Sequence, residues 1–450
     1  MSGADLPVRL IAPRWIAPVE PSGAVLVDHA VAVRGELIEA LLPAAEAAQR
    51  YPDAERIERP EHLLAPGLVN AHGHAAMALL RGAADDLPLG RWLRERVWPL
   101  EAALVSDAFV FDGTVLACRE MLRGGVTTFN DMYFFPEAAA RAALALGMRG
   151  VVGIICIDVP TAYGSGPDDY LAKGLRLRDA LRHEPGIAFA LAPHAPYSVS
   201  DGPLRTIAQL SAELQLPVHV HVHETASEIA EHVTAHGVRP LARLQRLGLV
   251  GPDLLAVHAV HLDDAEIALL AAEGASVAHC PHSNLKLASG IAPVARMLEA
   301  GVNVSIGTDG AAANNRLDLL LETRTAALLA KGSSGDATVL DAHRALHCAT
   351  LAGARALGLH ERVGSIVPGK LADLVAFDLS DPDLGPVVDP VSTLIYAGGR
   401  EHATDVWVAG NPVVVRRQMT ASRALDTLAA VLARRHVWHN RLGKIVPEST

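Results

Sequence analysis

Short apolar runs rich in β-branched residues alternate, through the middle of the chain, with longer runs of Ala, Leu, Glu and Arg. This alternation is typical of βαβ units, in which parallel strands are buried between helices. Eight runs are candidate strands, and they occupy residues 66–72, 125–131, 149–156, 187–194, 217–223, 254–258, 275–280 and 302–309. We therefore predict an α/β fold built on a (β/α)8 TIM-like barrel, with an open doubly wound sheet as the alternative.

The two flanks of the chain follow a different pattern. Residues 1–64 and 365–418 consist of short β-like runs separated by Gly and Pro turns. Because neither flank is long enough to bury a good core alone, we expect them to form one small β-sandwich from both chain ends. Residues 65–364 then make up the barrel, and residues 419–450 a C-terminal helix and tail. The segment KGSSGD, residues 331–336, is typical of a surface loop or short linker.

Composition narrows the class of protein. The 39 Lys and Arg against 50 Asp and Glu give a net charge of −11, which excludes the domain-wide basic surface of nucleic-acid binders. Four cysteines without a CxxC pair fit a reducing compartment rather than a disulfide framework. No stretch approaches the roughly 20 apolar residues of a membrane span, and no unbroken apolar signal segment begins the chain. We expect a soluble cytoplasmic protein without nucleic-acid or membrane partners.

The 21 histidines are unusual in number, and several stand where a candidate strand ends. In a (β/α)8 barrel the carboxyl ends of all strands open on one face, where active sites are built. We therefore expect a site for metal or proton chemistry on this face. The residues at strand ends are His72, His74, His194, His219, His221, His223, Glu224, His258, His279 and Asp309.

Spacing separates these histidines into candidate ligands and core residues. His72 and His74 are two residues apart, so both side chains point to one side of an extended segment. They could be loop histidines, but the apolar PGLVNA before them favours metal ligands. His219, His221 and His223 also share one face, although alternate residues climb about 6.6 Å along a strand and cannot all reach one ion. His221 is the preferred ligand with His223 as the alternative, and His219 fits a hydrogen-bonded core residue.

The acidic residues and His258 leave several roles open. Glu224 can carry protons beside a bound water, or it can act as an acid at the start of a helix. Asp309, in GTDG, can be an oxygen ligand and proton acceptor or a turn residue. His258 can be a ligand or a hydrogen-bond donor, and the role of His279 stays open. Three histidines and one carboxylate suit one divalent cation, with zinc preferred over iron or manganese.

The segments PGLVNAHGH, HVHET, AVHAVHL, GTDG and ATLAGARALGL…VGSIVPGKLADLVAFD resemble the amidohydrolase superfamily over essentially the whole chain. The resemblance implies a (β/α)8 barrel with a β-sandwich from both ends. It also implies a mononuclear site in which His258 holds the attacking water and Glu224 shuttles protons. The metal ligands that it implies are His72, His74, His221 and Asp309.

Within the superfamily, HAAMALLRGAADDLPLGRWLRERVWPLEA, APHAPYS and HCPHSNLKLASGIAPV are similar to the 5-methylthioadenosine/S-adenosylhomocysteine deaminases. This similarity implies hydrolytic deamination of an adenine nucleoside, with Glu224 and Asp309 acting on the base. It also implies that Glu101 binds the ribose hydroxyls and His194 contacts the substrate. Arg149 matches one of two arginines that bind the homocysteine carboxylate in some members, and no arginine matches the second.

The substrate therefore stays open among methylthioadenosine, S-adenosylhomocysteine and adenosine. Alternatives on the same site are guanine, 8-oxoguanine, a pterin, cytosine or a chlorinated triazine. A non-catalytic metal- or purine-binding barrel is a further alternative. The resemblance also leads us to expect a homo-oligomer.

Overall fold

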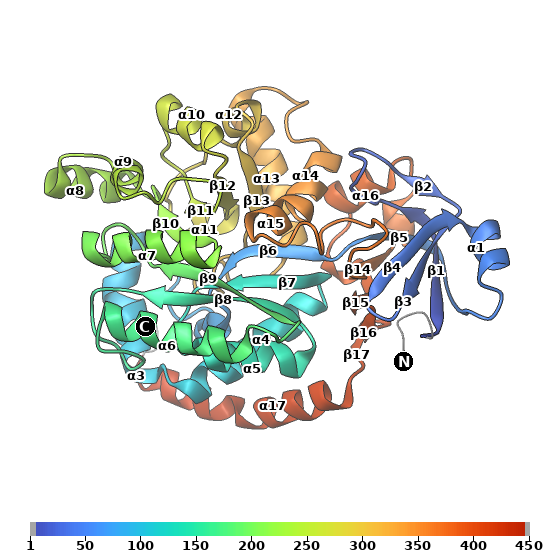
Figure 1. Cartoon of the computed structure of the whole chain (residues 1–450), viewed down its shortest axis with the longest axis horizontal. Helices are drawn as coiled ribbons and strands as arrows, with labels where there is room; N and C mark the ends of the chain where they lie inside the picture. Colours follow the sequence, from blue (N-terminus) through green and yellow to red (C-terminus); the bar gives the residue numbers. More distant parts are fainter. Residues whose placement is uncertain (1–5, 446–450) are drawn as a thin grey trace.

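A computed structural model describes residues 6–445 of the protein (Figure 1). Eight parallel strands follow one another in a single sheet, and the backbone N–H of Asp309 donates to the His72 carbonyl at 3.1 Å where its two ends meet. The nearly closed barrel that results confirms the predicted fold class. Its strands are β6 (Leu68–Gly73), β7 (Val126–Asp131), β8 (Arg149–Cys156), β9 (Ile187–Pro193), β10 (Val218–Val222), β11 (Leu254–His258), β12 (Ser276–His279) and β13 (Asn303–Ile306).

Helices surround the barrel, as the alternating pattern predicts (Figure 1). Local capping starts several of them, for example at Ser106, whose side chain accepts the Phe109 N–H, and at Thr225, which forms a capping box with Glu228. The helices are α4 (Asp107–Leu122), α5 (Pro136–Leu146), α6 (Pro167–Leu181), α7 (Asp201–Leu214), α8 (Ala226–His236), α9 (Pro240–Arg246), α10 (Asp264–Ala272), α11 (Pro281–Lys286), α12 (Val294–Glu299), α13 (Leu319–Ser334), α14 (Ala342–Cys348) and α15 (Leu351–Ala356).

An insertion of short helices follows β6 and stands over one side of the barrel mouth. It comprises η2 (Ala75–Leu80), α2 (Leu89–Arg91), η3 (Trp92–Val97) and α3 (Trp98–Leu104). Trp92, Val97, Leu100 and Leu104 are buried in one apolar cluster with Trp438 from the end of the chain. This packing fixes the insertion against the body of the molecule.

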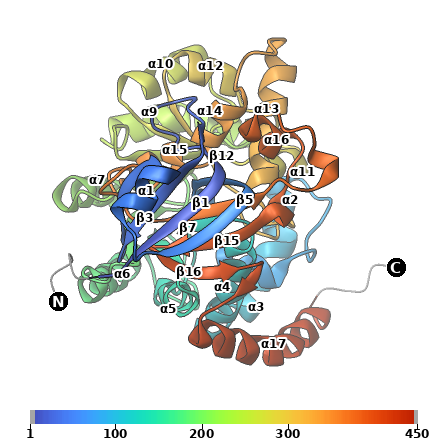
Figure 2. The ribbon, with the colours of Figure 1, turned by 90° about the vertical axis from the view of Figure 1, so that its right-hand side faces the viewer.

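Strands from both chain ends form a second sheet beside the barrel (Figure 2). The two ends join where β5 pairs antiparallel with β14. Eight of the nine strands follow one hydrogen-bonded path, and β2 pairs with β1 beside it. The sheet curls so that Val31 and Val33 share a core with Leu374 and Trp407. The strands are β1 (Val8–Ile16), β2 (Leu26–Val27), β3 (His29–Arg34), β4 (Leu37–Pro43), β5 (Glu55–Pro66), β14 (Leu374–Asp378), β15 (Ala403–Val408), β16 (Asn411–Val415) and β17 (Gln418–Met419), with α1 (Ala44–Arg50), α16 (Pro390–Tyr396) and η5 (Arg400–His402) beside them.

The C-terminal helix is α17 (Ser422–Gly443), which packs along α4 and α5 (Figure 1). The last residues of the expected tail, 446–450, lie outside the described residues, as do residues 1–5 of the first flank. The expectation of a loop at residues 331–336 is wrong in part, because Lys331–Ser334 complete α13 and the helix ends at Gly335 with φ of 71°. Within residues 6–445, no helix combines the length and the apolar character needed to cross a membrane.

Candidate active site

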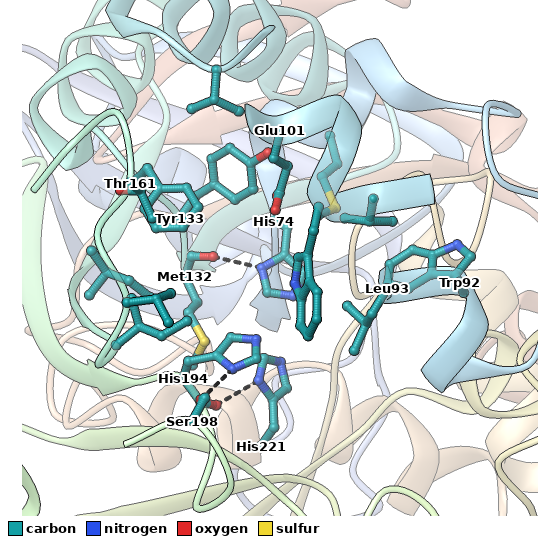
Figure 3. Close-up of a pocket in the computed structure, with 18 of the residues that line it drawn as sticks. His74, Trp92, Leu93, Glu101, Met132, Tyr133, Thr161, His194, Ser198 and His221 are labelled. Carbon is teal, nitrogen blue, oxygen red and sulfur yellow. Dashed lines mark hydrogen bonds between the residues drawn. The ribbon is translucent and has the colours of Figure 1, made fainter. Parts of the chain in front are cut away.

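A cavity of about 670 Å³ opens at the carboxyl ends of the barrel strands. The insertion after β6 forms one wall, and residues 155–162 after β8 form another. Its polar floor is made by residues that the sequence analysis singles out at strand ends, several of which Figure 3 labels. They are His74, His194, His221, Glu224, His258 and Asp309.

The four expected metal ligands meet at this floor. The Nε2 atoms of His72 and His74 lie 3.3 Å and 3.2 Å from Asp309 Oδ1. His221 Nε2 lies 3.3 Å from His72 Nε2. The ligand atoms of His72, His74 and Asp309 all lie within 4.8 Å of one another, which is close enough to share one cation.

The outer nitrogens of the rings fix how they face the floor. His74 Nδ1 lies 2.6 Å from the Met132 carbonyl, and His221 Nδ1 lies 2.8 Å from the His194 carbonyl (Figure 3). Because a carbonyl only accepts, each ring holds its proton on Nδ1 and directs Nε2 inward. This arrangement is the one that orients metal-binding histidines in proteins.

The protonation states of the histidine side chains at the floor also suit a bound cation. Burial lowers the pKa of His72 to about 3 and keeps that of His221 well below its ordinary value, so both rings are neutral. Burial opposes protonation of His74 as well, but the Asp309 carboxylate raises the His74 pKa to about 9. In the chain alone a proton thus lies between His74 and Asp309. A divalent ion can replace that proton, because metal binding to such ligands releases protons.

Two residues at the floor of the cavity have a strained backbone conformation. His258 and Asp309 have φ of 71° and 58°, in the left-handed region that non-glycine residues rarely adopt. Such residues cost about 1–3 kcal/mol each and cluster at functional sites. His258 is the last residue of the buried strand β11, Asp309 comes shortly after β13, and both line the cavity.

His223 does not join the floor, which leaves His221 as the histidine of β10 at the cation position. Its φ is 56°, its Nε2 accepts the Leu241 N–H at 3.2 Å, and its Nδ1 lies 3.4 Å from the Glu266 carboxylate. His219 lies below the floor with Nε2 at 2.7 Å from His72 Nδ1. His219 is thus the buried core residue that its register predicts.

Glu224 lies beside the cation position and is held from two sides. Its backbone N–H donates to Glu228 at 2.8 Å, and its Oε1 accepts from Ser289 Oγ at 3.4 Å. Burial, reinforced by the charge of Asp309, raises the Glu224 pKa to about 8. The carboxyl group is therefore protonated at neutral pH and can donate a proton. His258 Nε2 lies 3.7 Å from Glu224 Oε2, and its Nδ1 lies 2.9 Å from Asn284 Oδ1.

Glu101 extends from α3 into the upper part of the cavity (Figure 3). Burial raises its pKa to about 7. The Tyr133 hydroxyl lies next to it, and its interaction with the Glu101 carboxyl group opposes part of this rise in pKa. His194 Nδ1 lies 2.9 Å from Ser198 Oγ on the other side of the cavity. The two expected substrate contacts therefore line the same cavity as the cation position.

Comparison with known proteins identifies the family. The sequence profile of the amidohydrolase family matches residues 63–415. The chain belongs to the amidohydrolase family. The family assignment agrees with the barrel and its histidine-rich mouth.

Individual amidohydrolases are similar over most of their length. The chain is 46% identical over 431 residues to a 5-methylthioadenosine/S-adenosylhomocysteine deaminase of Teredinibacter turnerae, which covers 95% of this chain and 96% of the relative. It is 45% identical over 341 residues to a 5'-deoxyadenosine deaminase of Methanothermobacter thermautotrophicus, covering 74% and 78%. A crystal structure of an adenosine deaminase from Xanthomonas campestris with bound zinc has a TM-score of 0.94 and 50% identity, covering 97% of this chain and 98% of that chain.

Arg149 is not part of the amidohydrolase site, and the expectation that it binds substrate is wrong. It is the first residue of β8, at the end of the barrel opposite the cavity. Its guanidinium donates to both carboxylate oxygens of Asp373, at 3.3 Å and 3.1 Å, and to the Pro185 carbonyl at 3.0 Å. Arg149 thus joins the barrel to the sheet from the chain ends.

Several supporting residues escaped the sequence analysis. Ser283 Oγ donates to Asp309 Oδ2 at 2.6 Å, while Asn284, Ser289 and Glu228 contact His258 and Glu224 as described above. Three of them belong to HCPHSNLKLASG, a segment noted only for its resemblance. The capping-box pattern TASE gave the signal for Glu228, although not for its bond to Glu224.

Proposed function

We propose that this amidohydrolase deaminates an adenine nucleoside by metal-dependent hydrolysis, giving the inosine-type product and ammonia. The observation that carries the proposal is one cavity with two overlapping three-residue groups at its floor that could hold a cation, a protonated Glu224 beside them and a second glutamate, Glu101, in the cavity wall. The names of the similar proteins, which are deaminases of adenosine derivatives, support it.

One divalent cation, zinc before iron or manganese, would be held by His72, His74, His221 and Asp309. When bound, the ion would lower the pKa of a water molecule and stabilise the charge that develops during attack. The zinc in the similar adenosine deaminase structure supports this choice of metal.

The protein's own residues move the protons. His258 orients the attacking water, and Asp309, held by Ser283, accepts a proton from it. Glu224 donates its proton to N1 of the adenine ring, which makes C6 more electrophilic. The water oxygen bonds to C6, and the ionised Glu224 then takes the second proton of that water from the new hydroxyl group and passes it to the amino group, so that the C6–N bond breaks and ammonia leaves. The proton held by Asp309 returns to Glu224. A carbonyl remains at C6.

Glu101 would accept hydrogen bonds from the ribose hydroxyls, with the Tyr133 hydroxyl beside it. His194 would contact the substrate from the opposite wall. A free base offers no ribose, so this pair favours a nucleoside over guanine, cytosine or a triazine.

The cavity wall favours a small, uncharged 5' substituent. Among the described residues that line the cavity, none is lysine or arginine, and Asp158 adds a negative charge after β8. The homocysteine carboxylate of S-adenosylhomocysteine would thus lack a cationic partner, and burying an unpaired carboxylate is costly. We therefore expect methylthioadenosine or another 5'-apolar adenosine to be preferred.

Ammonia release from adenosine, methylthioadenosine, S-adenosylhomocysteine and guanine, with metal content measured in parallel, tests the proposal. We expect turnover of the adenine nucleosides, no turnover of guanine, and about tenfold or higher kcat/KM for methylthioadenosine than for S-adenosylhomocysteine. Turnover of guanine but not of adenosine would overturn the nucleoside assignment. A metal-loaded protein without any deaminase activity would favour the binding-barrel alternative.

Glu101→Ala separates nucleosides from free bases. Loss of charge-assisted hydrogen bonds to the ribose should lower kcat/KM about tenfold or more. Glu95→Ala, at an exposed position in η3, is the matched control and should leave kcat/KM unchanged. Unchanged activity of Glu101→Ala would contradict ribose binding by Glu101. The expected cytoplasmic location and homo-oligomeric state stay predictions.

A further inference from the structure

A second cavity, of about 460 Å³, lies outside the barrel and shares no lining residue with the first. Its walls come from η2, α4, η5 and the turn between β16 and β17, which are far apart in the sequence. Five of its eight lining residues are arginines, against one glutamate. The lining residues are Ala78, Arg81, Leu116, Arg119, Glu120, Arg123, Arg400 and Arg417.

The single glutamate is already shared by two of the arginines. Glu120 accepts from Arg81 Nη2 at 2.5 Å and from Arg400 Nη1 at 2.8 Å. Arg400 Nε also lies 3.7 Å from Asp318, which stands outside the cavity lining. Carboxylate partners for Arg81 and Arg400 are therefore accounted for.

The other three arginines have no carboxylate within 4 Å in the described part of the chain. Arg123 Nε donates to the Arg417 carbonyl at 3.2 Å. Arg417 donates to neutral backbone carbonyls, those of Arg400 at 3.2 Å and Ala403 at 3.4 Å, and also to that of Glu401. The Arg119 side chain makes no hydrogen bond with any residue between 6 and 445. Partial burial and the charge of Arg123 lower the pKa of both Arg119 and Arg417, so these charges repel one another.

The turn that supplies Arg417 is strained. Arg416 and Arg417 have φ of 46° and 65°, although turns of this kind favour Asn and Gly. Left-handed backbone costs about 1–2 kcal/mol for a residue with a side chain. Backbone strain and repulsion between like charges therefore occur at the same place, and both are unfavourable to stability. This combination is typical of a binding site and not of a cluster that stabilises the fold.

We propose that this cavity binds a phosphoryl anion, such as inorganic phosphate, pyrophosphate or the phosphate group of a nucleotide. Guanidinium groups match phosphate oxygens in two-point hydrogen bonds, and Arg119, Arg123 and Arg417 have donors to spare. The volume exceeds that of one phosphate group, so a diphosphate fits better than a single one.

A bound anion would also steady the active-site side of the molecule. Arg81 donates to the Asn315 carbonyl, and Glu120 accepts the Leu317 N–H at 3.1 Å. These contacts join the cavity to the segments that follow His74 and Asp309 in the chain. An anion that binds to the arginines of the folded protein should therefore raise its melting temperature.

Calorimetric titration of the metal-loaded protein with pyrophosphate, at constant ionic strength in potassium chloride, tests the proposal. We expect one saturable site per chain, a rise in Tm on binding, and weaker binding of phosphate than of pyrophosphate. Titration with ADP then separates a nucleotide source from a free diphosphate. Absence of saturable binding for all three anions would overturn the proposal.

The variants Arg119→Gln and Arg123→Gln, combined, locate the site. Pyrophosphate affinity should fall about tenfold or more, because two charged donors are lost. The matched control is Arg178→Gln with Arg182→Gln, in a separate arginine-bearing hollow beside the amino ends of β9 to β12, and it should leave affinity unchanged. Deaminase activity of both double variants should persist, which shows that they fold. Equal loss of affinity in the two, or a change of oligomeric state with no anion binding, would overturn the assignment.

Discussion

Glu224 and Asp309 are two buried carboxylates whose pKa values move in opposite directions. Burial and the neighbouring Asp309 raise the pKa of Glu224 to about 8. Burial also acts to raise the pKa of Asp309, but hydrogen bonds with His72 and His74 outweigh it and hold that pKa well below the ordinary value. Carboxylates separated in this way take the acid and the base roles in one site.

Replacing Glu224 by Gln should remove nearly all turnover while leaving metal content unchanged, because the amide cannot give up a proton. Glu231→Gln, at an exposed position on the same helix α8, is the control and should keep full activity. Metal analysis and ammonia release on both variants make the comparison. Near-normal turnover in Glu224→Gln would remove Glu224 from the proton-transfer role.

The pH profile provides an independent check. A Glu224 with a pKa of about 8 is protonated below that pH and loses its proton above it. kcat should therefore be steady near neutral pH and fall as pH rises through about 8. Steady-state rates between about pH 6 and pH 10 measure this dependence. A kcat that climbs through this range would contradict a protonated donor.

The position of a single residue relative to the cavity floor can be predicted from the sequence where strand geometry alone determines it. The 6.6 Å climb along a strand separates His219 from His221, and the structure has them below and at the floor. His223 could not be excluded, because its exclusion depends on left-handed backbone and on the distant Leu241 and Glu266. The error at Arg149 was avoidable, since the first residue of a barrel strand lies opposite the catalytic face.

At the scale of elements, α17 closes the side of the molecule that carries Glu101. Asp112 on α4 is buried and accepts from Arg434, at 2.5 Å and 3.2 Å, and from Trp438 Nε1 at 2.9 Å. Trp438 also packs edge-on against Phe109, with ring centroids 5.3 Å apart. The helix thereby reaches the apolar cluster under η3 and α3.

Asp112→Ala should destabilise the protein by about 2 kcal/mol, because it leaves the buried Trp438 N–H unpaired and loosens Arg434. Asp107→Ala is the control on the same helix. Its partner Arg141 is exposed, so its cost should stay below about 1 kcal/mol. Urea denaturation of both variants measures the difference. Equal stability of the two variants would contradict a stabilising role for the α17 contact.

Elements inside the barrel were more predictable than those outside it. The eight strands are apolar and bounded by turn residues, so each carries its own local signal. The helix end at Ser334 was missed because Gly and Ser in KGSSGD are typical of loops, whereas tertiary packing of α13 overrides that preference. The antiparallel pairing of β5 with β14 joins residues more than 300 positions apart, and such pairing leaves no local pattern.

At the scale of the whole molecule, the proposed cation position joins separate parts of the barrel. His72 belongs to β6 and His74 follows it, His221 belongs to β10, and Asp309 follows β13. An ion bound only by the folded chain stabilises it by about 4 kcal/mol at a thousand times its Kd. Folding and metal binding should therefore be coupled.

Removing the metal with a chelator should abolish deamination and lower the Tm, and added zinc should restore both. Thermal scans and ammonia assays on the treated, reconstituted and untreated protein make the comparison. Full activity in protein shown by elemental analysis to be metal-free would contradict a metal-dependent reaction.

The proposed reaction needs one ion shared by residues from distant parts of the chain, and anomalous X-ray diffraction tests this directly. Crystals of the active, metal-analysed protein would be measured above and below the zinc absorption edge. We predict one anomalous peak per chain, about 2.0–2.2 Å from nitrogen atoms of His72, His74 and His221 and from a carboxylate oxygen of Asp309. Active protein whose anomalous signal lies elsewhere, or whose four side chains surround no ion, would contradict the account.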